Sequence, residues 1–149
     1  MLAEYNKNFA RQDIKFKVIC SCPRRVLLFV YCEELLCKTL RQKEAVSYLQ
    51  QLGYGEYFDL ERYLQMLGAR IQLGPEFPHE LGVFLGYPVE DVIDFVTFGG
   101  RHSQLTGYWK VYHNIEKAKN IFVAYDRWKD YFLRRLAAGI PLHKVLLMA

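Results

Sequence analysis

Two strand-like segments near the start of the chain limit its fold more than any other feature. Residues 14–20 alternate between apolar and polar side chains, which is typical of a strand with one buried face. Residues 26–31 are apolar without interruption and predict a strand that is buried on both faces. The turn-forming residues between them, 22–25, join the two strands into a predicted hairpin.

Helical spacing of apolar residues dominates the segment after this hairpin, and a shorter amphipathic helix is predicted before it, over residues 2–11. Glycines at 53 and 55 separate the second predicted helix from the third. Asp59 is placed to cap the third helix, whose apolar stripe is interpreted as core rather than as a cofactor-binding face. The three helices are predicted at 33–40, 43–52 and 60–71, with the stripe at Leu60, Tyr63, Leu64, Leu67 and Ile71.

The second half of the chain mixes predicted strands and helices. Residues 81–85 are apolar and too few for an independent helix, so they are interpreted as a buried strand. Pro88 suits the first turn of a helix, and Asn114 can cap a long final helix that turns an apolar face inward. The further elements are a strand at 105–112, a helix at 114–138 with Ile115, Ala118, Ile121, Phe122, Tyr125, Trp128, Phe132 and Leu136 inward, and a short helix after Pro141.

These elements predict an α+β fold in which a mainly antiparallel sheet of about four strands is covered by helices, with a long C-terminal helix. The whole chain, residues 1–149, is expected to form a single domain, because 52% apolar residues are enough for a core of its own. No apolar run approaches the roughly 20 residues that span a bilayer, so no membrane association is expected. The first residues lack a basic and apolar leader, which predicts a cytoplasmic location.

The charge of the chain is modest but unevenly distributed. Lys and Arg total 20 against 16 Asp and Glu, and a net charge of +4 disfavours nucleic acid as a partner. Residues 76–100 carry five acidic and no basic side chains, whereas residues 101–149 carry nine basic and three acidic ones. The basic residues of the final helix are interpreted as a solvated face.

Four cysteines lie within the first quarter of the chain. Zinc sites usually pair their ligands as Cys-x2-4-Cys twice, whereas Cys20-x-Cys22 lies where a strand alternates and Cys32-x4-Cys37 departs from the helical i,i+4 step. The cysteines are therefore expected to be reduced, small apolar side chains, and no metal site is predicted.

Two segments of the second half concentrate residues that can carry chemistry. A histidine beside carboxylates can act as a general base, and a lysine flanked by aromatic side chains can bind an anion. His79 does not begin a zinc-protease motif, because the position four residues on is Val83. The cofactor, and whether the chain is an enzyme at all, stay open. The candidate ligand-binding residues are His79, Glu80, Tyr87, Asp91, Tyr108, Trp109, Lys110 and Tyr112.

The same two segments carry a family resemblance. Residues 77–92 read FPHE-x-G-x-FLGYP-x-EDV, and residues 107–112 read GYWKVY. Together they closely resemble the blocks of a bacterial family, domain-of-unknown-function family 3793. The resemblance extends from the first strand pair through the last helix, and it implies no activity, substrate or cofactor.

The chain departs from that family's pattern in three places. Similar proteins carry an N-terminal segment of the type Cys-Ala-Pro-x-Leu-Ala-Gly-x-Lys that is not intact here, so a shortened or divergent member is expected. Thr106 stands where the family often has a cysteine, and residues 94–98 stand where it usually has Gly-Phe-Ile-Glu-Asn. An activity that needs the missing N-terminal segment or that cysteine is not expected of this chain.

Three interpretations follow for function. The first is a cytoplasmic protein that binds a small molecule or an anion at a site formed by both blocks. The alternative is a protein-interaction module or homodimer without catalytic activity, using exposed aromatic side chains such as Tyr54, Tyr57 and Phe58. In the third, the two blocks serve packing alone, with Trp109 in the core and His79 and Glu80 bonded to buried backbone groups.

Overall fold

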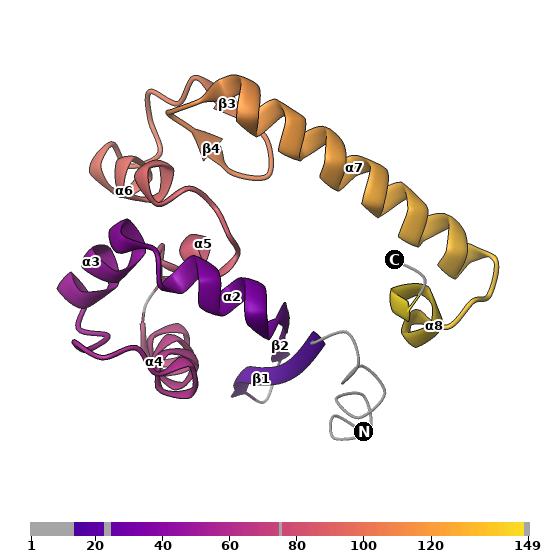
Figure 1. Cartoon of the computed structure of the whole chain (residues 1–149), viewed down its shortest axis with the longest axis horizontal. Helices are drawn as coiled ribbons and strands as arrows, with labels where there is room; N and C mark the ends of the chain where they lie inside the picture. The colour runs from indigo at the N-terminus through magenta and orange to yellow at the C-terminus, as the bar shows by residue number, and fades with distance from the viewer. Residues whose placement is uncertain (1–13, 23–24, 75, 148–149) are drawn as a thin grey trace. The chain divides into compact units, whose positions relative to one another are not determined.

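The computed structural model describes residues 14–22, 25–74 and 76–147. The helix predicted over residues 2–11 lies outside these residues. Helices make up most of the described chain, and the described strands form two antiparallel sheets of two strands each (Figure 1). The prediction of an α+β fold with small antiparallel strands and a long C-terminal helix is confirmed, but the four strands do not join into one sheet.

Packing divides the chain into two compact units, residues 1–92 and residues 93–149. The boundary falls inside helix α6 (Val89–Thr97), so the first turn of this helix belongs to one unit and its last turns to the other. The prediction of a single domain stays a prediction.

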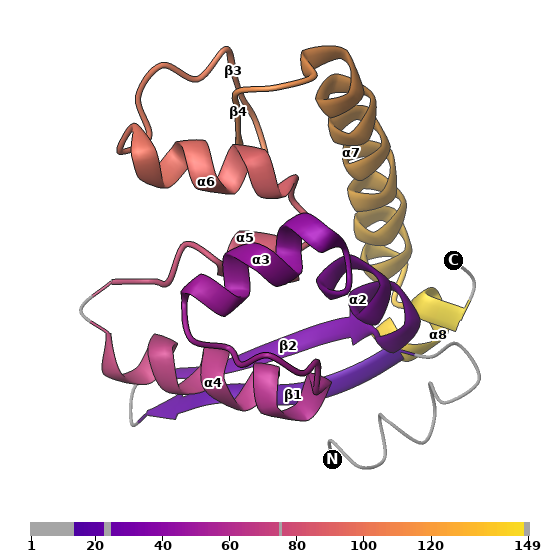
Figure 2. The same cartoon turned by 60° about the vertical axis from the view of Figure 1, so that its left-hand side comes forward.

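The first unit begins with the predicted hairpin. Strand β1 (Ile14–Cys22) pairs antiparallel with β2 (Arg25–Cys32), and their register shifts between Val18 and Cys20. Helix α4 packs against β1 and α2 against β2 (Figure 2). The expectation that β2 is buried on both faces was wrong, because Val26, Leu28 and Val30 are 62%, 44% and 46% exposed. Only the side chains that alternate with them meet the helices.

The three helices after the hairpin follow the sequence prediction closely. They are α2 (Glu33–Leu40), α3 (Lys43–Gln51) and α4 (Leu60–Leu73). Asp59 caps α4 as predicted, because its carboxylate accepts a hydrogen bond of 3.0 Å from the backbone N–H of Arg62. The predicted stripe of α4 is core, and its buried members are Tyr63, Leu64, Leu67 and Ile71.

The predicted strand at 81–85 was wrong. The segment forms a one-turn helix, α5 (Leu81–Phe84), that buries Val83 and Phe84. Gly86 then reverses the chain with a φ of +82°, a conformation that glycine adopts without steric cost. At Gly82 a Cβ atom would lie 2.9 Å from Val92 Cγ2, so the chain can coil this tightly only with glycine there.

The second unit contains the last turns of α6 and a small hairpin. Residues 105–112 do not form one strand, as predicted, but two strands of two residues, β3 (Leu105–Thr106) and β4 (Lys110–Val111). The chain reverses between them, and the N–H of Gly107 bonds the carbonyl of Trp109 at 3.0 Å. A side chain at 107 would collide with the ring of Phe122, so this turn lies directly against the long helix.

That long helix, α7 (Ile115–Ala137), is followed by α8 (Leu142–Leu147). Asn114 caps α7 as predicted and accepts a hydrogen bond of 3.4 Å from the N–H of Lys117. The predicted inward stripe is wrong at Tyr125, Trp128 and Leu136, which are exposed, whereas Ala118 is buried and the other four members are partly buried. The turn between β3 and β4 contacts Phe122, Tyr125 and Asp126 on one side of α7, and α8 contacts the end of the helix, whereas Trp128 in the middle stays 48% exposed.

We predict that Gly68→Ala destabilises the protein by about 2 kcal/mol. A Cβ at this position would collide with the carbonyl oxygen of Ile19, so α4 would have to move away from β1. Urea denaturation of the full chain measures the change in the free energy of unfolding. Gln72→Ala, at an exposed position of the same helix, is the control and should change it by less than about 0.5 kcal/mol. Equal stability of the two variants would contradict the close approach.

Candidate functional site

The eight predicted site residues fall into two groups, one in each unit. His79, Glu80, Tyr87 and Asp91 belong to the first unit. Tyr108, Trp109, Lys110 and Tyr112 belong to the second unit. A single site formed by both groups therefore stays a prediction, while the role of each residue inside its own unit can be described.

Glu80 is the centre of a buried polar cluster in the first unit. Its side chain is 2% exposed, and one carboxylate oxygen accepts hydrogen bonds from Arg70 Nε and, at 3.2 Å, from the hydroxyl of Tyr54. Tyr54 is fully buried, whereas the side chain of Arg70 is partly exposed. An ionised carboxylate is tolerated at such depth because a cation and a hydroxyl donor satisfy it.

The cluster also changes the acidity of its tyrosines. Burial and, secondly, the charge of Glu80 raise the pKa of Tyr54 well above its usual value. The same two causes raise the pKa of Tyr48. Tyr54 therefore keeps its proton and remains a donor to Glu80 throughout the physiological pH range. Sequence reasoning selected Glu80 but missed Arg70 and Tyr54, because 10 and 26 residues separate them from it along the chain.

The other residues of the first group have different environments. His79 is exposed, next to the buried Glu80. Tyr87 is half-buried, and its ring lies 3.1 Å from the position that a Cβ on Gly82 would occupy. Asp91 is 2% exposed in the first turn of α6, where the positive end of the helix dipole favours a carboxylate.

In the second group, Trp109 and Tyr108 pack against α7. Trp109 is buried, with its ring 4.6 Å from that of Phe122 in an edge-to-face arrangement. The hydroxyl of Tyr108 donates a 2.8 Å hydrogen bond to Asp126, and its ring lies 5.0 Å from that of Tyr125. These contacts fasten the turn between β3 and β4 to the long helix.

Lys110 and Tyr112 also make contacts within the second unit. The Lys110 ammonium donates a hydrogen bond to the carbonyl of Gly100, which ties β4 to the loop that follows α6. Tyr112 is buried, with its ring 5.8 Å from that of Phe98. The described contacts of this group are thus the kind that hold a small unit together.

A surface that sequence reasoning missed lies on α7. Every residue from 123 to 130 is exposed, which is more than two turns of helix. Ala124, Arg127, Trp128 and Tyr131 line an open cleft of about 430 Å³. Arg135 lies one turn beyond Tyr131, with its guanidinium 5.1 Å from that ring. We call these five residues the α7 face.

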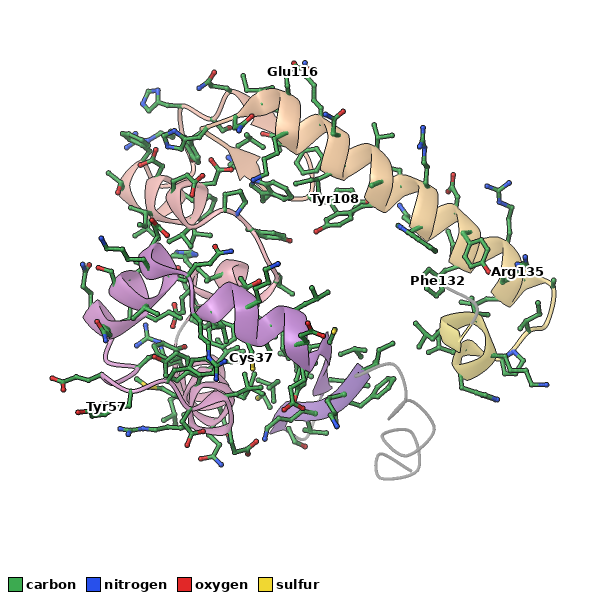
Figure 3. The ribbon with its side chains drawn as sticks, viewed as in Figure 1. Cys37, Tyr57, Tyr108, Glu116, Phe132 and Arg135 are labelled. Atoms are coloured by element: carbon green, nitrogen blue, oxygen red, sulfur yellow. The ribbon has the colours of Figure 1, made fainter. Side chains whose placement is uncertain are left out.

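The hairpin and Phe132 lie on one side of α7. Figure 3 shows Tyr108 and Phe132 on this side and Glu116 on the opposite side.

The sequence did contain a signal for the α7 face, because Trp128 belongs to the predicted apolar stripe. The sequence predicts this stripe to be core, because the helical period of apolar residues shows that they share a face but does not show whether that face is buried.

A second cavity lies in the first unit. It measures about 350 Å³, and the tight turn at Phe84, Leu85 and Gly86, part of the first sequence block, forms one wall. Strand β2 and helix α2 form the other walls with mainly apolar side chains. The arrangement suits an apolar ligand rather than an anion, because none of the described residues that line the cavity is charged.

Two further observations concern metals and membranes. In the described part of the chain, no group of three or more His, Cys, Asp or Glu side chains is arranged to hold a metal ion. None of the described helices combines the length and the apolar character needed to cross a bilayer.

Of the aromatic side chains expected to be exposed, Tyr57 is 85% exposed, but Tyr54 is fully buried, so the expectation was wrong for Tyr54.

We predict that Glu80→Ala lowers the free energy of unfolding by about 2 to 3 kcal/mol, because it leaves Arg70 and Tyr54 without their shared acceptor. Glu76→Ala, an exposed acid on the same segment, should change it by less than about 0.5 kcal/mol. Chemical denaturation at neutral pH measures both variants. If the two variants unfold at the same denaturant concentration, the buried cluster does not stabilise the fold.

Comparisons with known proteins identify the family. The family model described as protein of unknown function DUF3793 matches residues 1–146. No curated protein and no solved structure matches the chain. The match spans nearly the whole chain, including both sequence blocks, Glu80 with its partners, and α7. The chain therefore belongs to the DUF3793 family.

Proposed function

We propose that this chain is a protein-interaction module and that the α7 face is its binding surface. The observation that carries the proposal is the continuous exposure of residues 123–130 in the middle of a 23-residue helix. Isolated helical segments are marginally stable in water and normally gain stability by packing an apolar face. A helix of this length with Ala118 as its one buried residue leaves that face available to a partner.

The composition of the α7 face supports the proposal. Trp128 is 48% exposed, although tryptophan contributes more apolar area than any other side chain. Tyr131 and Arg127 line the same cleft. Tryptophan, tyrosine and arginine are the residues that most often carry the binding energy of protein interfaces. Exposed apolar side chains grouped in this way mark interaction sites in many soluble proteins.

The compartment and the oligomeric state belong to the same proposal. Cys20 is buried and forms no disulfide, which supports a reducing, cytoplasmic location. A homodimer through α7 is one form that the proposed interaction can take, and the experiment below distinguishes it from binding to a different protein.

We predict that a photo-crosslinking amino acid in place of Tyr131 forms a discrete adduct with a protein in living cells of the source organism. Trp128→Ala in the same chain should abolish the adduct, because it removes the largest apolar contact of the cleft. The matched control carries the crosslinker in place of Tyr57, which is 85% exposed in the first unit. Mass spectrometry identifies the linked peptides.

Each outcome of this experiment is decisive. Trp128→Ala should lower the free energy of unfolding by less than about 1 kcal/mol, so loss of the adduct reports binding rather than unfolding. An adduct with twice the mass of the chain means a homodimer. A link to residues 14–92 of the same chain, or no difference from the Tyr57 control, overturns the proposal.

Ligand binding is a second candidate, supported by the apolar cavity beside the first sequence block. We predict that the full chain enhances the fluorescence of the uncharged apolar dye Nile red and that Leu35→Asp, in the cavity wall, weakens this enhancement several-fold. The control is Leu73→Asp, which is equally apolar and more exposed but lies outside the cavity. Equal dye binding by the two variants would argue against a ligand in this cavity.

A further inference from the structure

We propose that the partner of the α7 face is an acidic amphipathic helix with two carboxylates about two helical turns apart. This inference rests on the proposed function and names the chemistry of its partner. It is carried by the positions of the charged residues around Trp128, which can be derived from helix geometry and the observed contacts.

The basic residues of the α7 face lie in one row. Arg127, Tyr131 and Arg135 are four residues apart, so their side chains follow one another along the same side of the helix. Arg127 lines the cleft, and the Arg135 guanidinium lies over the Tyr131 ring. The two guanidiniums therefore flank the aromatic part of the face, and the rise of the helix places them about 12 Å apart along its axis.

The acidic residues of this part of α7 lie across the helix from Trp128. Asp126 and Asp130 are each two residues from Trp128, which places them about 160° around the helix from it. Asp126 accepts the hydrogen bond from Tyr108. Among the described residues, neither Arg127 nor Arg135 has an ion pair, so both can pair with carboxylates from outside the chain.

This distribution of charge complements an acidic partner. An arginine can bind a carboxylate through two parallel hydrogen bonds, and it loses little entropy because the guanidinium is planar and rigid. A partner helix with carboxylates seven or eight residues apart spans about the distance between Arg127 and Arg135. Apolar side chains between those carboxylates would enter the cleft beside Trp128.

A second copy of the chain fits this face less well. In a parallel pair of α7 helices, each arginine would meet its own counterpart. In an antiparallel pair centred on Tyr131, Arg127 of one copy would meet Arg135 of the other. Both orientations bring like charges together, which is unfavourable at an interface.

Nucleic acid also fits less well than an acidic helix. A surface that binds a phosphate backbone usually has a broad patch of several lysine and arginine side chains. The α7 face offers only two arginines. An apolar cleft between two cations matches a peptide with an apolar centre better.

The inference is tested with three fluorescein-labelled helical peptides of equal length that share two central leucines. The first carries two glutamates eight residues apart on either side of the leucines. The second has lysines at those two positions, and the third has its two glutamates adjacent. Fluorescence anisotropy with the full chain at low salt measures the affinity for each peptide. We expect the first peptide to bind at least tenfold more tightly than the other two.

Matched variants test which residues are responsible. The double variant Arg127→Glu and Arg135→Glu should reverse the preference in favour of the lysine peptide. The control, Lys38→Glu with Lys43→Glu, makes the same change in net charge at exposed positions of the first unit and should keep the original preference. Trp128→Ala should weaken binding of the first peptide at least tenfold.

The remaining outcomes separate this inference from the proposed function. Equal binding of the glutamate and lysine peptides, abolished by Trp128→Ala, would overturn the acidic partner and leave the interaction surface in place. Binding of none of the peptides would overturn the acidic partner, whereas the crosslinking experiment decides the surface independently. Displacement of the first peptide by a 20-nucleotide single-stranded RNA at equal concentration would also overturn it, in favour of nucleic acid.

Discussion

The buried carboxylate of Glu80 is the interaction on which the first unit depends most. It joins three separate segments, because Tyr54 precedes α4, Arg70 lies in its last turns and Glu80 immediately precedes α5. A charge at this depth is stable only with both donors in place. The cluster therefore sets the position of α5 and of the turn at Gly86, which in turn forms one wall of the apolar cavity. Its described contacts give Glu80 a role in the packing of the first unit.

In the second unit, one side of α7 is fastened and another is exposed. Trp109 and Tyr108 hold the small hairpin against Phe122, Tyr125 and Asp126 of α7, and α8 contacts the helix end. Another side of the same helix presents Trp128 with Arg127 and Arg135 near it, and Asp126 and Asp130 lie across the helix from Trp128. Such a surface is costly for a chain that works alone and useful for one that binds a partner. This contrast is the basis of our proposal that α7 binds a partner.

Local patterns predicted the elements that depend on neighbouring residues. The hairpin, α2 and α4 with its cap at Asp59 lie where alternation, helical spacing and capping place them. The prediction failed at 81–85 and at 105–112, where the deciding contacts are distant in sequence. Gly82 is confined by Val92, and Gly107 by Phe122. A short apolar run is compatible with a strand or with a helix, and contacts with residues distant in sequence decide between the two.

The sequence alone determined the family blocks, the secondary structure of residues 14–73, and which residue types could carry function. Only the tertiary structure decided what those residues do. In the folded chain, Glu80 accepts hydrogen bonds from Arg70 and Tyr54, and Lys110 donates one to a backbone carbonyl. Trp128 is exposed. The physical reason is that the period of a pattern records which side chains share a face, whereas burial depends on what packs against that face. The burial of a face is a property of the folded chain and of its partners.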